Sequence, residues 1–176
     1  DLFGRGAINS TAMYDNMVNK FKWGGVNTPG VYLDENVQRM LANFRSTFAR
    51  LALQLISENK PDSARKVLDK CGEVIPDRVV PYNVYNILIV EAYFKLGDTA
   101  KALEIAGALK NNVYQDIDYF LSLGRKYNSY LSYEKRVAYY TLDELRRMAE
   151  TYNQPALKKD VEEKLQVFAS GLSASL

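Results

Sequence analysis

The sequence predicts an all-α fold made of repeated antiparallel helix pairs. Apolar residues recur at steps of three and four along most of the chain, which is the spacing of one helix face. One pattern of residues also occurs twice. Asn59 and Ala64 of the first copy match Gly97 and Ala102 of the second, a spacing of 38 residues. A period of this length is typical of helical repeat proteins, in which each pair covers the apolar face of the next.

The composition limits the possible functions of the chain. Of its 176 residues, 47% are hydrophobic, which is enough for one domain with a substantial core. The 23 Lys and Arg residues nearly balance the 21 Asp and Glu residues, so no basic surface for nucleic acid or anionic lipid is indicated. The chain has no histidine and one cysteine, and so lacks the commonest general base and metal ligand. No apolar run approaches the ~18 residues of a membrane-spanning helix.

The N-terminal segment, residues 1–33, is predicted to hold one short helix and a loop. Polar residues at positions 9–11 are suited to cap a helix over residues 11–21. Glycines and a proline predict a loop with two turns over residues 22–33. We assign residues 34–176 to the helical repeat and expect a single domain overall. Because the sequence opens at Asp1 without a signal-peptide pattern, we interpret it as a fragment of a longer protein.

The first helix pair has the clearest signals. Asp34 is a good N-cap for an amphipathic helix that ends near Asn59, a residue type that accepts a left-handed backbone. Pro61 fits the first turn of the partner helix. Pro76 then ends that helix.

Two further pairs are expected after residue 81. A helix over 82–96 is apolar nearly all round and should therefore be buried at the centre. Gly97 ends it and Asp98 caps the next helix, which we expect to break near residues 111–112. A turn is predicted at 124–129, followed by helices over 132–152 and 156–170. No strand is predicted.

These elements together predict a tetratricopeptide-like, right-handed stack of about three antiparallel helix pairs. Small residues at Ala52, Ala64 and Ala102 allow the paired helices to approach closely. The third pair matches the repeat only loosely, since Lys158 stands where alanine is expected. An ordinary helical bundle without a repeat is the alternative.

No group of residues predicts a catalytic, cofactor-binding or metal site. Asp116 and Asp118 form the Asp-x-Asp pattern with which many glycosyltransferases hold a divalent metal. On a helix, however, residues two apart point about 200° apart. Cys71 lies on an apolar helix face and is expected to be a buried thiol.

The predicted binding surface is the inner groove of the repeat. Leu53 and Ile56 lie off the main packing ridge on that side, and either a partner segment or this chain's residues 11–33 should cover them. We favour the chain's own segment, anchored by Phe21 and Trp23. The other expected groove or partner contacts are Tyr82, Tyr85 and Glu91.

Five stretches carry a narrower resemblance: residues 13–24, 31–36, 44–45, 50–52 and 80–83. They resemble a family of large bacterial multi-pass membrane proteins of unknown function. That family is itself similar to polytopic sugar transferases that use lipid-linked donors, including protein O-mannosyltransferases, and its members carry a helical-repeat tail. The resemblance implies that the catalytic acid lies in the membrane part, and that the tail faces the periplasm.

We therefore expect a non-catalytic protein-interaction or accessory domain of a membrane-anchored, glycosyltransferase-like protein. Its partners would be protein or peptide segments, with the membrane part of its own chain as one candidate. Nucleic acid, cofactors and insertion into the membrane are not expected. The alternative is a free-standing cytoplasmic scaffold that binds peptide segments. The apolar groove positions argue against the polar clamp that such scaffolds use for peptide carboxylates, and an enzyme is the least favoured reading.

Overall fold

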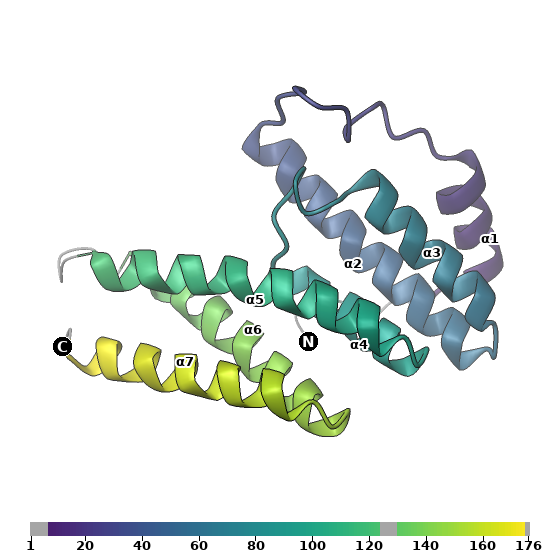
Figure 1. The fold of residues 1–176 in the computed structure, drawn as a ribbon. Helices are drawn as coiled ribbons and strands as arrows, with labels where there is room; N and C mark the ends of the chain where they lie inside the picture. The colour runs from purple at the N-terminus through teal and green to yellow at the C-terminus, as the bar shows by residue number, and fades with distance from the viewer. Residues whose placement is uncertain (1–6, 124–129, 175–176) are drawn as a thin grey trace. The chain divides into compact units, whose positions relative to one another are not determined.

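The computed structural model describes residues 7–123 and 130–174, and in this part of the chain the fold is all-α (Figure 1). The α-helices are α1 (Ser10–Tyr14), α2 (Glu35–Ser57), α3 (Pro61–Val74), α4 (Ile87–Lys95), α5 (Thr99–Ser122), α6 (Ser132–Thr151) and α7 (Pro155–Ala174). A π-helical segment, η1 (Asp15–Lys20), extends α1, and a 3₁₀ turn, η2 (Val84–Asn86), precedes α4. The described residues contain no strand, as predicted.

Neighbouring helices pack antiparallel, and the chain divides into two compact units. The first unit ends at Ile105 and the second begins at Ala106, so that α5 runs from one into the other. Each unit is considered separately below. Among the described helices, none has the length and apolar character needed to cross a membrane.

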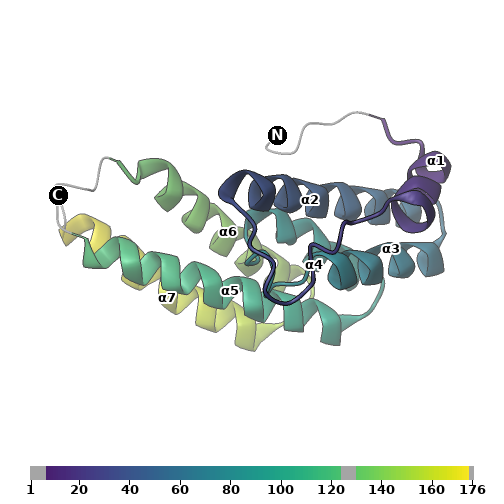
Figure 2. The same ribbon diagram turned by 90° about the horizontal axis from the view of Figure 1, so that it is seen from above.

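The first helix pair follows the sequence closely. The Asp34 side chain accepts a hydrogen bond from the Val37 amide at 2.8 Å and so caps α2. Pro61 is the first residue of α3, as predicted. Helices α2 and α3 lie side by side in both views (Figures 1 and 2). Their buried faces include Phe48, Leu51, Ala52, Leu55, Ala64 and Leu68.

The three turns between paired helices share one geometry. Asn59, Gly97 and Asn153 all have a left-handed backbone, with φ of 58°, 74° and 54°. The amide of the next residue bonds to the carbonyl five positions earlier in each turn, at 2.9 Å, 3.0 Å and 2.7 Å respectively. This is the Schellman motif, which satisfies carbonyls at the end of a helix. Each following helix begins two residues after the left-handed residue.

Helix α4 begins later than predicted. The Asn83 side chain accepts a hydrogen bond from the Tyr85 amide, and the Asn86 side chain accepts one from the Asn83 amide, both at 3.1 Å. This reciprocal cap fixes a 3₁₀ turn at 84–86, and the α-helix starts only at Ile87. Most of α4 is buried, as its apolar sequence predicts.

Helix α5 does not break at residues 111–112, so that prediction was wrong. Leu109, Val113 and Ile117 are all buried and continue one helical stripe through this region. Burial of such a stripe outweighs the modest helix propensity of two asparagines. The turn predicted at 124–129 lies outside the described residues.

The second unit consists of α6, α7 and the part of α5 after Ile105. Helix α7 runs antiparallel to α6 after the Asn153 turn and parallel to α5. The parallel direction follows from two contacts in register: the Tyr114 hydroxyl donates to the Asp160 carbonyl at 3.0 Å, and Lys164 pairs with Asp118 at 2.5 Å. The Lys164 ammonium also lies 5.0 Å from the centre of the Tyr114 ring.

A buried arginine holds the connection between α3 and α4. Arg45 of α2 is 0% exposed, and its guanidinium donates to backbone carbonyls of the connection. Its Nη2 bonds to Ile75 at 3.0 Å, to Pro76 at 3.1 Å and to Val80, and its Nη1 bonds to Pro81 at 3.1 Å. The carbonyls thus supply the polar surroundings that a buried charge requires.

The N-terminal segment packs on α2, as predicted. Figure 1 shows α1 beside the C-terminal end of α2, with the following loop running back toward the start of that helix. The Ser10 hydroxyl donates to the Glu58 carboxylate at 2.7 Å. The Trp23 ring lies 5.4 Å from the centres of both Phe44 and Phe48, so Trp23 is an anchor of this segment.

The position of this anchor differs from the prediction, however. We expected Trp23 to cover the groove positions Leu53 and Ile56. Instead it lies on Phe44 and Phe48, and a nine-residue step along a helix places Leu53 about 180° around the axis from Phe44. Leu53 and Ile56 are both partly buried. Phe21 contacts the Trp23 ring edge-on and remains 46% exposed.

Replacement of Arg45 should destabilise the protein strongly. Arg45→Met leaves several buried carbonyls without a donor, and we expect a loss of about 3 kcal/mol in the free energy of unfolding. Arg45→Lys should lose about 2 kcal/mol, because an ammonium cannot reproduce the spread of a guanidinium. Urea denaturation measures both values. The control Arg39→Met, whose side chain is exposed beside Glu35, should change stability by less than about 0.5 kcal/mol.

The same substitution should have opposite effects at two glycines. Gly97→Ala places a side chain on a left-handed residue and should lower the free energy of unfolding by about 1 kcal/mol. Gly72 lies within α3, where an added Cβ meets nothing within 4 Å. Gly72→Ala should therefore raise the free energy of unfolding by about 0.5–1 kcal/mol. Thermal unfolding followed by circular dichroism distinguishes the two. Equal changes in the unfolding temperature of the two variants would contradict the left-handed conformation assigned to Gly97.

Candidate functional site

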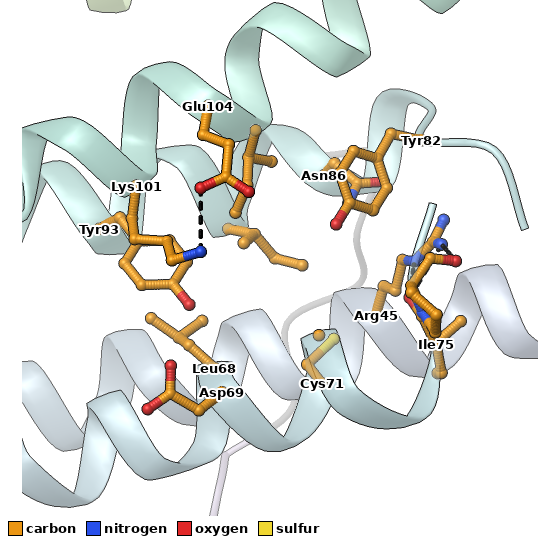
Figure 3. A pocket seen from close by; sticks show the side chains of 14 residues that line it. Arg45, Leu68, Asp69, Cys71, Ile75, Tyr82, Asn86, Tyr93, Lys101 and Glu104 are labelled. Carbon is orange, nitrogen blue, oxygen red and sulfur yellow. Dashed lines mark hydrogen bonds and ion pairs between the residues drawn. The ribbon is translucent and has the colours of Figure 1, made fainter. Parts of the chain in front are cut away.

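A cavity of about 320 Å³ lies in the first unit, between α3, η2, α4 and the first turns of α5 (Figure 3). Its floor is aliphatic and buried. Its mouth carries exposed charged side chains. The floor is formed by Leu68, Cys71, Ile75, Ile89 and Ile105, and the mouth includes Asp69, Gly72, Lys101 and Glu104.

Two local sequence features position the mouth. The Asp98 side chain accepts a hydrogen bond from the Lys101 amide at 3.2 Å and so starts α5 at this point. Lys101 and Glu104 are then one turn apart, and their side chains form an ion pair of 2.9 Å. Asp69 faces the cavity from α3 and forms no ion pair with any residue of the described chain.

Polar side chains close the cavity at the end nearest α2. The Arg45 guanidinium lies 4.8 Å from the centre of the Tyr82 ring. Burial lowers the pKa of Arg45 and raises the pKa of the Tyr82 hydroxyl. The oxygen of the Asn86 side chain accepts the bond from the Asn83 amide, but its Nδ2 is buried and has no hydrogen-bond partner among the described residues.

Two titratable groups of the cavity, Cys71 and Tyr93, stay protonated near neutral pH. Burial raises the pKa of the Cys71 thiol to about 12, so the thiol stays protonated. Burial, with a smaller effect from Asp69, also raises the pKa of Tyr93 above its ordinary value. The Lys101 ammonium forms an ion pair with the Glu104 carboxylate. The arrangement offers shape, charge and hydrogen-bonding groups to a ligand, with no activated nucleophile.

Of the predicted contact residues, only Tyr82 lines this cavity. Tyr85 lies in η2 and is partly buried. Glu91 pairs with Lys95 at 2.7 Å along α4. Leu53 and Ile56 are on α2 and do not line the cavity. The cavity thus contains one of the five predicted residues, and the wider contact surface that they were expected to form stays a prediction.

Sequence reasoning missed Asp69, Lys101 and Glu104 as possible binding residues. Each has the appearance of an ordinary helix residue, and only packing of α3 against α4 and α5 places them around one opening. One signal was available in the sequence. Gly72 stands inside a helix, where glycine is unfavourable, and no neighbouring atom requires it there.

The Asp-x-Asp pattern is part of the second unit. Ile117 between the two acids is buried, and Asp118 pairs with Lys164 of α7. Burial raises the pKa of Asp116. Among residues 7–123 and 130–174, no three or more Cys, Asp or Glu side chains are grouped so that they could hold a metal ion.

Comparison with protein-family models, curated proteins and solved structures gave no match to this chain.

The Cys71 thiol should be unreactive in the folded protein. At pH 8 we expect no reaction with a disulfide reagent until denaturant unfolds the chain, because the thiol is both buried and protonated. Its folded pKa lies above its unfolded value. The stability it contributes is therefore complete below about pH 9 and is lost as the pH rises toward 12.

The matched variant is Cys71→Ala, which retains the tyrosines. Its free energy of unfolding should fall less steeply than that of the original chain between pH 9 and 11. Identical slopes in urea titrations at these pH values would contradict the assignment.

Proposed function

We propose that this chain is a non-catalytic interaction domain, built from tetratricopeptide-like helix pairs in a right-handed stack, which holds a segment of another polypeptide. The observation that carries the proposal is the repetition of one turn geometry at Asn59, Gly97 and Asn153. A chain that repeats one helix-pair unit builds an extended surface rather than an enclosed catalytic pocket.

The burial pattern supports the repeat interpretation. Residues 38 positions apart in the first two pairs are buried in both copies. The matched positions are Leu51 with Ile89, Ala52 with Val90, Leu55 with Tyr93, Ala64 with Ala102, and Val67 with Ile105. The parallel direction of α5 and α7 is also what every second helix of a repeat stack adopts. The spacing from Gly97 to Asn153 is 56 residues, so the third pair is an enlarged variant.

The chemistry of the cavity also favours binding over catalysis. The sequence contains no histidine, and the one thiol is buried with its pKa raised to about 12. Catalytic acids and bases need pKa values near the working pH and access to substrate. Around the cavity, Lys101 and Glu104 are instead paired with each other, Arg45 lies against the Tyr82 ring, and the Cys71 thiol stays protonated.

The setting that we propose rests on the resemblance of the five stretches between residues 13 and 83 to bacterial multi-pass membrane proteins. It places this domain on the periplasmic side as the tail of a glycosyltransferase-like protein. The coding sequence upstream of Asp1 tests this placement. Multiple hydrophobic spans of ~20 residues would support it, and an upstream sequence without such spans would overturn it.

Peptide selection tests the binding function. A display library of random 12-residue peptides is selected on the immobilised chain and, as a control, on the same chain unfolded by Arg45→Met and denaturant. We expect sequences enriched only on the folded chain. A selected peptide at 100 times its dissociation constant should raise the free energy of unfolding by about 2.7 kcal/mol. Absence of enrichment on the folded chain would contradict the proposal.

A turnover assay tests the non-catalytic part. The chain is incubated with a lipid-linked sugar donor and an acceptor peptide, and the products are examined by mass spectrometry. We expect no glycosylated peptide, because the sequence has no histidine to act as general base and the buried thiol stays protonated. Sugar transfer that follows the amount of protein and disappears on unfolding would show that this domain is itself an enzyme.

A further inference from the structure

We propose that the cavity of the first unit receives the side chain of a lysine or arginine from the bound polypeptide. The inference rests on the proposed function, because it names the chemical group that one part of the binding domain recognises. It is independent of the membrane setting. It is drawn from the shape of the cavity and from the charges around its mouth.

The shape of the cavity suits a long side chain with an aliphatic stem. Its volume of about 320 Å³ is near the lower end of the range for ligand pockets, about 300–1,000 Å³. The buried aliphatic floor of Leu68, Ile89 and Ile105 can pack against methylene groups. Lysine and arginine bury their stems on apolar surface in this way while the charged end stays at a polar rim.

The charges at the mouth favour a cation. Asp69 is exposed and forms no ion pair with a described residue, and the Lys101 ammonium that acts on it electrostatically is already paired with Glu104 at 2.9 Å. Two carboxylates therefore face one ammonium at the opening. The second cation of the cavity, Arg45, is fully buried, and its charge is met by the carbonyls of the α3–α4 connection.

Two tyrosines complete the surroundings. Figure 3 shows Asp69, Tyr93 and Glu104 around the same opening, with Tyr82 near Arg45 at the other end. Tyrosine rings attract cations through their faces, and a hydroxyl oxygen can accept a hydrogen bond from an ammonium or a guanidinium.

Other kinds of side chain fit these groups less well. An acidic side chain would bring a third carboxylate beside Asp69 and Glu104. A purely apolar side chain would fill the floor but would partly bury the Asp69 carboxylate without a cation, which is unfavourable. A basic side chain satisfies both the floor and the mouth.

The experiment uses three capped tripeptides as probes: acetyl-Gly-Lys-Gly-amide and its analogues with norleucine or glutamate in place of lysine. Each is titrated into the full chain, and binding is followed by backbone amide shifts in NMR spectra. We expect saturable shifts for residues 68–72 and 101–105 with the lysine probe. Its affinity should exceed that of the norleucine probe by about five-fold, and the glutamate probe should bind more weakly than both.

Four variants locate the binding. Asp69→Asn should reduce the affinity for the lysine probe to that for norleucine, whereas Asp62→Asn, an exposed acid on the same helix, should have no effect. Gly72→Trp should fill the mouth and abolish binding of all probes. Lys66→Trp adds the same side chain at an exposed position of α3 that does not line the cavity, and should bind as the original chain does. Circular dichroism checks that each variant is folded.

Several outcomes would overturn the inference. Equal affinities for the lysine and norleucine probes would show an apolar cavity without charge recognition. Tighter binding of glutamate would reverse the sign of the proposal. Shifts that survive Gly72→Trp, or their absence with the lysine probe, would exclude the cavity as the binding site. These results are separate from the peptide selection, since a selected peptide that binds the Gly72→Trp variant equally well would leave the interaction function intact.

Discussion

The stability of the first unit depends on the buried guanidinium of Arg45, which is surrounded by backbone carbonyls. Arg45 is removed from water entirely, which is costly for a guanidinium unless its donors find partners. Those partners come from the connection between α3 and α4, so the arginine and the connection order each other. This contact holds the chain just before Tyr82 and the cap at Asn83, after which α4 begins.

Much of the fold could be predicted from the sequence, and the successes are local. Asn59 and Gly97 could be placed in their turns because the left-handed conformation depends on the residue itself. The failures involve long-range contacts. At residues 111–112 the helix stays intact because Leu109, Val113 and Ile117 are buried, which outweighs the modest helix propensity of the two asparagines. Trp23 could be identified as an anchor, but its partners on α2 are set by the path of a loop without periodic sequence.

The candidate site was less predictable than the fold for the same reason. Tyr82 could be named because a large amphipathic ring beside a central helix suggests a contact surface. Asp69 and Lys101 resemble solvated helix charges, and their meeting across a cavity requires the packing of two helices. Arg45 is the extreme case. Its partners are carbonyls about 30 residues away, which every residue possesses and no sequence pattern marks.

The shared turn has a consequence for how this architecture can diverge. At the three left-handed positions the residues are Asn, Gly and Asn, and the residues that follow are Lys, Asp and Gln. What repeats is therefore the backbone torsion angle and the carbonyl–amide hydrogen bond of each turn. The residue types in the turns differ. Related chains would be recognisable by left-handed residues spaced 38 and 56 positions apart, even where their side chains have nothing in common.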